Sequence, residues 1–270
     1  MNESFEPGIP LNTWFSNSHS HSHSYSNSHS HSQGQCQSQC QSQCYSPIKF
    51  GTVVNIMLHE MINSDGSLKT QLAYPLSDIH GESLTISGFS FGFHPWFLEN
   101  LSLDQAEQSL LYFGKSLTCR AIGETGLDAL RGVSHDQQLG FFRMHLSVAK
   151  LLGRPLVIHC VRRHQEVIAE LKRGAFCGNL MVHGFSLRWA IASMWLSVGA
   201  FLSFGEALIN GSLALKETFI KCPLDKILLE TDDSIIDIGK IYREGATLKA
   251  MSIDHFTEQI NKNYLAFYNG

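Results

Sequence analysis

In AIGETGLD (121–128), an apolar run is followed by a glutamate. Three later apolar runs are likewise followed by a histidine or an acidic residue. The other three segments are PLVIHC (155–160), LMVHGF (180–185) and ILLETDD (227–233). Each run is too apolar to face water on one side, which is typical of parallel strands covered by helices. Strand ends of this kind, separated by helix-length segments, predict a site at the C-terminal mouth of a β/α barrel.

Further strands and helices extend the pattern in both directions. Four more strand candidates, which bring the total to eight, are residues 13–18, 52–58, 85–93 and 200–205. Amphipathic helices are expected at residues 102–115, 135–152, 164–173, 188–197, 212–221 and 254–268. This alternation predicts a parallel α/β sheet, and eight strands predict its closure into a TIM-type (β/α) barrel. The segment between the second and third strands is irregular, so the barrel could lack one helix there.

Two helices carry local signals at their ends. Ser102 followed by Gln105 is a capping-box pattern at the start of the first predicted helix. The second helix is expected to end at Gly153. Its buried face is predicted to consist of Leu139, Phe142, Leu146 and Ala149.

Composition favours one enzyme-sized domain over residues 1–270. The chain has 270 residues and 43% hydrophobic content, enough for a large core. Its net charge of −4 gives no global electrostatic reason to bind nucleic acid or a membrane. No apolar run reaches transmembrane length, and the N-terminus does not resemble a secretory signal, so we expect a cytoplasmic protein. Four of the seven cysteines, which we expect to be reduced and buried, are Cys119, Cys160, Cys177 and Cys222.

A low-complexity segment interrupts the pattern after the first predicted strand. Residues 16–44 alternate His with Ser and then repeat Gln-Ser-Gln-Cys, and we place the insertion itself at residues 22–46. Such a polar composition cannot form a packed core, which favours a disordered insertion. The alternative is a loop that binds Zn, Cu or Ni loosely through its histidines and three cysteines.

The predicted strand ends carry the candidate chemistry. Glu124, His159, His183 and Asp232 each follow an apolar run, where a side chain can point into the mouth of a barrel. Imidazoles and carboxylates together suit Zn, Mn or similar divalent ions. Each residue alone could be a hydrogen-bonded core or capping group, but unpaired buried charges are expensive, so the joint pattern favours a metal site.

These motifs, in this order, resemble the TatD family of metal-dependent hydrolases. The resemblance covers about residues 85–265 and includes GETGLD, VHGFS, LSFG, LLETDDS and FGFHPW (91–96). The chain looks most similar to short bacterial members with HPW and ETDDS motifs. The resemblance implies a TIM-type barrel with one or two divalent metal ions (Zn, Mn or Mg), and hydrolase activity that in some members is a deoxyribonuclease or 3′–5′ exonuclease activity.

The family also has an H-x-H pair at the end of its first strand. His19 and His21 directly follow the strand candidate 13–18, and we interpret them as this pair. His21 with His23 is an alternative register, and a third alternative is that the pair is lost and the histidine tract only imitates it.

The resemblance assigns a role to each candidate. The implied metal ligands are His19, His21, Glu124, His159, His183 and Asp232, with Glu124 bridging two ions and Asp232 and Glu124 acting in catalysis. His94 and Arg162 are candidate substrate-binding residues. Arg163, Arg188 and Glu206 are weaker candidates near the same strand ends, and Asp128 is expected to fix its loop.

The function predicted from these assignments is metal-dependent hydrolysis through an activated water, most simply of a phosphodiester in DNA or a small molecule. Alternatives are a metallohydrolase of amide or ester bonds, or a metal-binding protein with a degenerate active site, because a fold by itself does not determine the reaction. No membrane or obligate protein partner is evident from the sequence.

Overall fold

Seven parallel strands in sequential order form the framework of the protein. The computed structural model describes residues 51–57 and 85–269, with side chains from residue 89 onward. The strands are β1 (Gly51–Met57), β2 (Thr85–Gly92), β3 (Cys119–Asp128), β4 (Leu156–Val161), β5 (Leu180–Val182), β6 (Phe201–Phe204) and β7 (Ile227–Leu229). Each strand pairs with its neighbour in the sequence, from β1 to β7. Sequential parallel order is the order of a TIM-type barrel.

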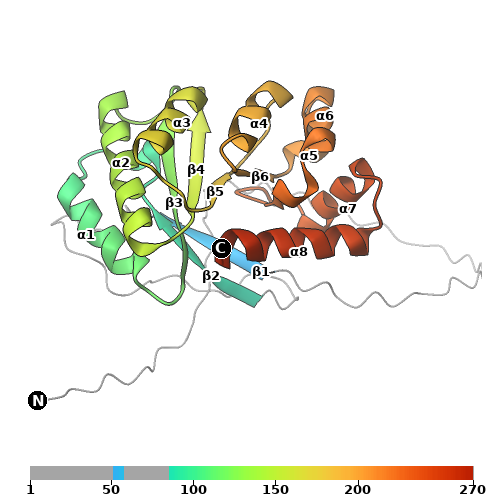
Figure 1. Cartoon of the computed structure of the whole chain (residues 1–270), viewed down its shortest axis with the longest axis horizontal. Helices are drawn as coiled ribbons and strands as arrows, with labels where there is room; N and C mark the ends of the chain where they lie inside the picture. Colours follow the sequence, from blue (N-terminus) through green and yellow to red (C-terminus); the bar gives the residue numbers. More distant parts are fainter. Residues whose placement is uncertain (1–50, 58–84, 270) are drawn as a thin grey trace, which may run out of the picture.

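Helices connect the strands from β2 to β7 and cover the outside of the sheet (Figure 1). The helices are α1 (Leu103–Gly114), α2 (His135–Leu152), α3 (His164–Arg173), α4 (Trp189–Leu196), α5 (Ala207–Asn210), α6 (Leu213–Lys221), α7 (Ile238–Leu248) and α8 (Ile253–Asn269), with short 3-10 turns η2 (Pro95–Phe97) and η3 (Leu224–Lys226). The fold is therefore α/β, as the alternation of strands and helices predicts.

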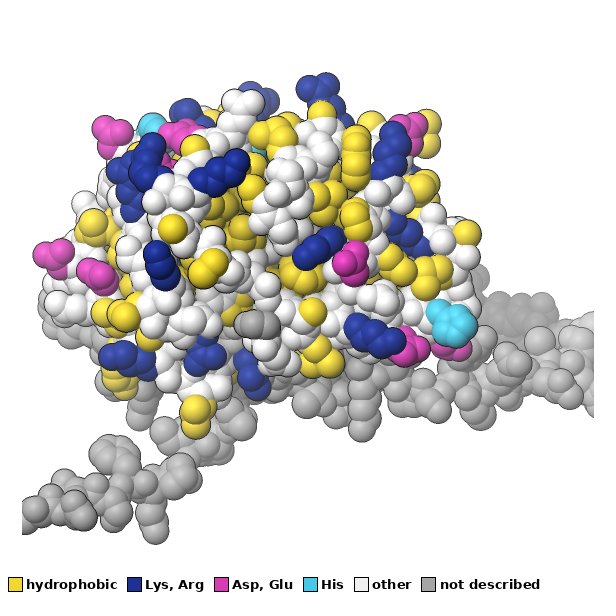
Figure 2. All heavy atoms as spheres, viewed as in Figure 1, with side chains coloured by type: hydrophobic (Ala, Val, Ile, Leu, Met, Phe, Trp, Pro, Cys, Tyr) yellow, Lys and Arg dark blue, Asp and Glu magenta, His cyan; other side chains and the backbone are white. Residues whose placement is uncertain are grey.

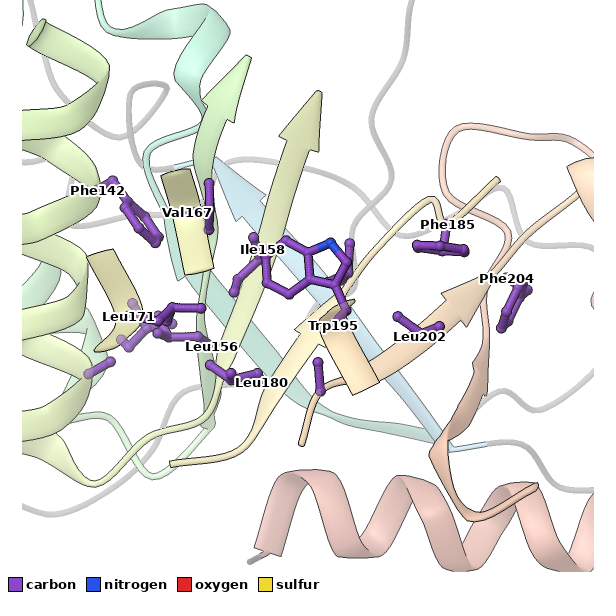
Figure 3. Close-up of a cluster of buried hydrophobic side chains, with 14 of the residues drawn as sticks. Phe142, Leu156, Ile158, Val167, Leu171, Leu180, Phe185, Trp195, Leu202 and Phe204 are labelled. Carbon is purple, nitrogen blue, oxygen red and sulfur yellow. The ribbon is translucent and has the colours of Figure 1, made fainter. Parts of the chain in front are cut away.

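The main core lies between the helices and the outer face of the sheet. Trp195 of α4 is fully buried, and Figure 3 shows it between Ile158 of β4 and Leu202 of β6. Its indole Nε1 donates a hydrogen bond to His164 Nδ1 at 3.2 Å, so its one polar atom is satisfied. This packing fixes α3 and α4 against the strands whose ends carry the candidate site.

A second, smaller cluster lies on the inner face of the sheet. In β4, Leu156 and Ile158 belong to the outer core, whereas Val157 packs with Phe201 and with Phe267 of α8. Side chains alternate between the faces of a strand, so His159 lies on the same face as Val157. The inner face is therefore apolar next to α8 and carries a histidine toward the C-terminal end of β4.

Helix α8 covers the N-terminal ends of the strands. Asn263 Nδ2 donates hydrogen bonds to the carbonyls of Leu224 and Ile227, at 2.7 and 2.8 Å, next to the start of β7. Asn179, just before β5, donates to the carbonyls of Ala266 and Phe267. These contacts place α8 at the opposite end of the strands from their C-terminal ends.

Several local expectations are confirmed and two are wrong. The predicted bounds of α2 and α3 agree with the structure, and Gly153 ends α2 in the left-handed conformation, with φ of 62°. Ser102 precedes α1, but its side chain makes no capping hydrogen bond, and only its backbone carbonyl accepts a bond, from the Ala106 N–H. Cys177 is exposed rather than buried, since it lies in the turn between α3 and β5.

Other expectations fall outside the described residues. These are the first strand (13–18), the His19 and His21 pair, the insertion at 22–46 and the irregular segment between β1 and β2.

Charged side chains of both signs are mixed on the surface. Figure 2 shows acidic, basic and histidine side chains together along the upper edge, where α3 lies in Figure 1. One such mixed group joins α2 and α3: His135 Nε2 lies 2.6 Å from Glu166 Oε1, and Arg163 contacts the same carboxylate. Among the residues from 85 to 269, no helix combines the length and apolar character needed to cross a bilayer.

Candidate metal centre

Four side chains converge at the C-terminal ends of neighbouring strands. His94 follows β2, Glu124 lies in β3, His159 in β4, and His183 directly follows β5. One ligand atom from each of these residues lies within 4.8 Å of the others. Parallel strands bring their carboxyl ends to one edge of the sheet, which is why residues 89 positions apart in the chain (94 to 183) meet.

The centre of the cluster is an ion pair between Glu124 and His183. Glu124 Oε2 lies 3.0 Å from His183 Nε2, and both side chains are largely buried. Burial alone would lower the pKa of His183, but the charge and hydrogen bond of Glu124 raise it to about 10. Burial likewise opposes ionisation of Glu124, but His183 lowers its pKa. The pair is therefore charged at neutral pH.

Asp128 orients His159 from behind. Its Oδ2 accepts a hydrogen bond from His159 Nε2 at 3.0 Å and another from Trp96 Nε1 at 2.6 Å. Its Oδ1 accepts from the backbone N–H groups of Leu130 and Arg131, which fixes the loop as the sequence predicts. Burial works against ionisation, but these four hydrogen bonds lower the pKa of Asp128.

This contact selects the tautomer of His159. Because Nε2 donates to Asp128, the lone pair is on Nδ1, which lies 3.2 Å from His183 Nε2 at the centre of the cluster. Burial lowers the pKa of His159, which keeps the ring neutral. A carboxylate behind a neutral imidazole is the usual support of a metal-binding histidine.

His94 has the opposite arrangement. Its Nδ1 accepts a hydrogen bond from the backbone N–H of Trp96 at 3.2 Å, so the neutral ring carries its proton on Nε2. That nitrogen lies 3.7 Å from Glu124 Oε2. Burial, and then the electrostatic interaction with the His159 ring, lower the pKa of His94 to about 3. His94 thus presents an N–H group to the centre, which suits an anion or a water better than a metal ion.

Glu230 is a nearby carboxylate that the sequence analysis missed. Its Oε2 accepts a 2.5 Å hydrogen bond from Ser203 Oγ, Oε1 accepts from the Gly184 N–H, and Oε1 lies 4.0 Å from His183 Nδ1. Burial raises the pKa of Glu230. The only sequence signal for Glu230 is the acidic run ETDD, in which the pattern favours Asp232, two residues later.

Asp232 and Arg162 lie outside the four-residue cluster. Asp232 interacts electrostatically with His183 and Glu124, and its pKa is raised by partial desolvation and by the charge of Glu124. Arg162 follows β4 with an exposed side chain. Both residues have the left-handed backbone conformation, with φ of 49° for Asp232 and 57° for Arg162. Such strain is uncommon in residues other than glycine and tends to cluster at functional sites.

The weaker candidates have ordinary structural partners. Arg163 contacts Glu166 at 3.4 Å, and Glu206 Oε2 accepts a 2.5 Å hydrogen bond from Ser234. Arg188 is exposed at the start of α4. None of the three belongs to the four-residue cluster.

The cluster fits a divalent metal ion by its donor chemistry. It combines one carboxylate with imidazoles, the mixture that Zn and similar ions take. His159 already has its lone pair directed inward, and its outer nitrogen is satisfied by Asp128. His159 is thus oriented for an ion by the protein itself.

Comparison with known proteins agrees with this chemistry. The family model described as TatD-related DNase matches residues 76–269. An uncharacterized metal-dependent hydrolase of Haemophilus influenzae is 28% identical over 155 residues, which are 53% of this chain and 58% of that protein. A 3′-5′ ssDNA/RNA exonuclease TatD of Pantoea ananatis is 29% identical over 180 residues, 64% of this chain and 66% of that protein. The chain thus spans little more than half the length of the first of these relatives.

A solved structure supports the same arrangement of elements. The crystal structure of YjjV, a TatD homolog from Escherichia coli, superposes with a TM-score of 0.59 at 25% sequence identity, over 68% of this chain and 77% of that one. An uncharacterized amidohydrolase from Saccharomyces cerevisiae, with a TM-score of 0.57 at 15% identity, shares the fold.

Proposed function

Because this chain belongs to the TatD-related DNase family, we propose that it is a divalent-metal-dependent hydrolase of phosphodiester bonds in DNA or small phosphodiesters. The observation that carries the proposal is the convergence of His94, Glu124, His159 and His183 at one end of the sheet. The relative from Pantoea ananatis, which acts on single-stranded DNA and RNA, supports a nucleic-acid substrate.

We assign the metal ligands in two groups. Glu124, His159 and His183 would hold one ion, and Glu124 with Asp232, His19 and His21 would hold a second. His19 and His21 are outside the described residues, so their assignment rests on the sequence resemblance. When bound, the ions would supply an activated water and positive charge for the phosphate.

The remaining residues act on the substrate and on the proton. His94 donates toward a phosphate oxygen from Nε2, which carries the ring proton because Nδ1 accepts from the Trp96 N–H. Arg162 pairs with a neighbouring phosphate at the rim. Asp232 accepts the proton of the attacking water, which is a role that a carboxylate at the mouth of the strands can take as a general base.

Turnover by the Glu124→Gln variant tests the proposal. We expect wild type with Mn²⁺ or Zn²⁺ to hydrolyse bis-p-nitrophenyl phosphate, and Glu124→Gln to lose at least a hundredfold in kcat/KM. The exposed Glu99→Gln is the matched control. Activity of Glu124→Gln equal to wild type, or hydrolysis of p-nitrophenyl acetate alone, would overturn the phosphodiesterase assignment.

Metal stoichiometry tests the first-strand pair. Replacing His19 and His21 with Ala should remove one of two bound ions from protein lacking residues 23–44, whereas replacing His29 and His31 in the full chain should not. Loss of the ion on deletion of 23–44 alone would shift the register to His23 or beyond.

A further inference from the structure

An exposed aromatic ring lies directly beside the metal centre. Phe97 is at the end of η2, three residues after His94, and its residue is 44% exposed. The centroids of the Phe97 and His94 rings are 5.7 Å apart. An aromatic side chain of this size is usually buried, so a ring that faces solvent next to a catalytic cluster suggests a contact with a ligand.

A stacked pair continues this surface. The guanidinium carbon of Arg131 lies 3.8 Å from the centroid of the Trp96 ring. The Trp96 indole is held in place by its Nε1 hydrogen bond to Asp128, the residue that also orients His159. Arg131 is itself exposed, and the adjacent Leu130 is 60% exposed.

The two loops that carry these side chains are locked together. Gly132 has φ of 95°, and a Cβ atom built on it would lie 2.2 Å from the Pro95 carbonyl oxygen, so the two backbones touch. Gln138 Nε2 donates to the Arg131 carbonyl at 3.1 Å. A surface held this way loses little conformational entropy when a ligand binds.

We propose that Trp96, Phe97, Leu130 and Arg131 form a stacking surface for one unpaired base of a single-stranded nucleic acid whose phosphodiester lies at the metal centre. The inference rests on the proposed function and extends it to the part of the substrate that is recognised. Unstacked bases bind to aromatic rings and arginine planes, whereas the bases of a duplex are already stacked. Because every base has a π-face, the surface favours single strands without reading their sequence.

Two oligonucleotides that differ only in their bases test the proposal. One is oligothymidylate and the other is an abasic oligomer of the same length, so backbone charge is equal. With the Mn²⁺-loaded full chain, we expect wild type to bind oligothymidylate about tenfold more tightly by fluorescence anisotropy, and to cleave it with a correspondingly lower KM. Phe97→Ala should remove this preference and leave binding of the abasic oligomer unchanged.

Matched variants separate stacking from charge and packing. Phe97→Tyr should keep the preference, because the ring remains. Arg131→Lys should weaken it, because lysine keeps the charge but not the plane. Tyr112→Ala removes another exposed aromatic, near the end of α1 that leads to the start of β3, and should change nothing.

The outcomes distinguish this inference from the function on which it rests. Equal binding of both oligomers by wild type, or an equal loss for both in Phe97→Ala, would overturn the stacking surface. A base preference that Phe97→Ala abolishes, in a protein that cleaves neither oligomer, would support the stacking surface and refute the phosphodiesterase.

Discussion

Asp128 illustrates how one side chain can serve both the loop and the site. One carboxylate oxygen holds the backbone of Leu130 and Arg131, and the other sets the tautomer of His159. Asparagine can keep the first role, since its carbonyl oxygen still accepts from backbone N–H groups. It carries out the second role poorly because it has no negative charge.

We therefore predict that Asp128→Asn folds normally but binds Zn²⁺ or Mn²⁺ about 10- to 100-fold more weakly, the usual effect of losing such a partner. Isothermal titration of the metal measures the affinity, and circular dichroism checks the fold. Asp136→Asn, an exposed substitution in the first turn of α2, is the control. An unchanged dissociation constant in Asp128→Asn would mean that His159 does not bind metal.

His145 is a buried histidine whose ring accepts one hydrogen bond and donates another. Its Nε2 accepts from the Phe93 N–H at 2.9 Å, and its Nδ1 donates to the Phe141 carbonyl at 2.7 Å. Burial lowers the pKa of His145 to about 4 from 6.5. Between these values the unfolded chain binds a proton that the folded chain does not, so stability falls as the pH drops from about 6.5 to about 4.

This linkage predicts a measurable loss at mildly acidic pH. From pH 7.5 to pH 5, His145 should cost about 2 kcal/mol of unfolding free energy, and His145→Gln should lack that component of the pH dependence. Urea unfolding of metal-free protein at both pH values measures it. His255→Gln, exposed on α8, controls for removing a histidine as such. The same pH dependence in wild type and His145→Gln would contradict the prediction.

At the scale of elements, the helices that the sequence predicts best have clear ends and strong apolar periodicity. The bounds of α2 agree because Ser134 caps its start and Gly153 ends it. Helix α7 was not predicted, because Gly239 and Gly245 lower its helical propensity. Gly245 is useful only in the folded protein, where the ring of Phe256 packs closely against it.

The candidate site was likewise predictable only where local sequence patterns indicate its residues. The strand-end positions of Glu124, His159 and His183 predict that these side chains lie close together, since alternation and strand order suffice to place them, and in the structure they do lie close together. The contact of Asp128 with Trp96 joins residues 32 positions apart, and no local pattern encodes it. Glu230 was missed for a similar reason, because its partners Ser203 and Gly184 come from other strand ends.

A substitution that adds one methyl group tests the contact between the loop after β2 and the loop after β3. Gly132→Ala should destabilise the protein by about 1–3 kcal/mol, because the new Cβ meets a backbone oxygen and the left-handed conformation is strained. Gly140→Ala is the control, since nothing lies within 4 Å of its Cβ position and alanine favours a helix. Thermal unfolding that ranks Gly132→Ala at or above wild type would show that the two loops are free to separate.

At the scale of the whole molecule, the metal centre links several strands, because its ligands lie in or directly after them. Glu124, His159 and His183 come from three adjacent βα units, so an ion bound by all three stabilises only the folded chain. At a concentration about a hundredfold above its dissociation constant, Mn²⁺ or Zn²⁺ should add about 3 kcal/mol of stability.

Differential scanning calorimetry should therefore show a higher Tm with the ion and a lower one after chelation. Glu124→Gln should show little response to either treatment, with Glu99→Gln responding as wild type does. An equal rise of Tm in Glu124→Gln would place the stabilising ion elsewhere, for example in the His/Cys tract.

The ion pair of Glu124 and His183 has a further consequence, for the heat of metal loading. His183 carries a proton at neutral pH, with a pKa of about 10, and it can bind an ion only after that proton has left. Binding of the metal ion therefore releases the His183 proton, and the buffer takes up that proton. The heat measured on titration should differ between buffers of low and high ionisation enthalpy, such as phosphate and Tris, and the difference counts the protons released.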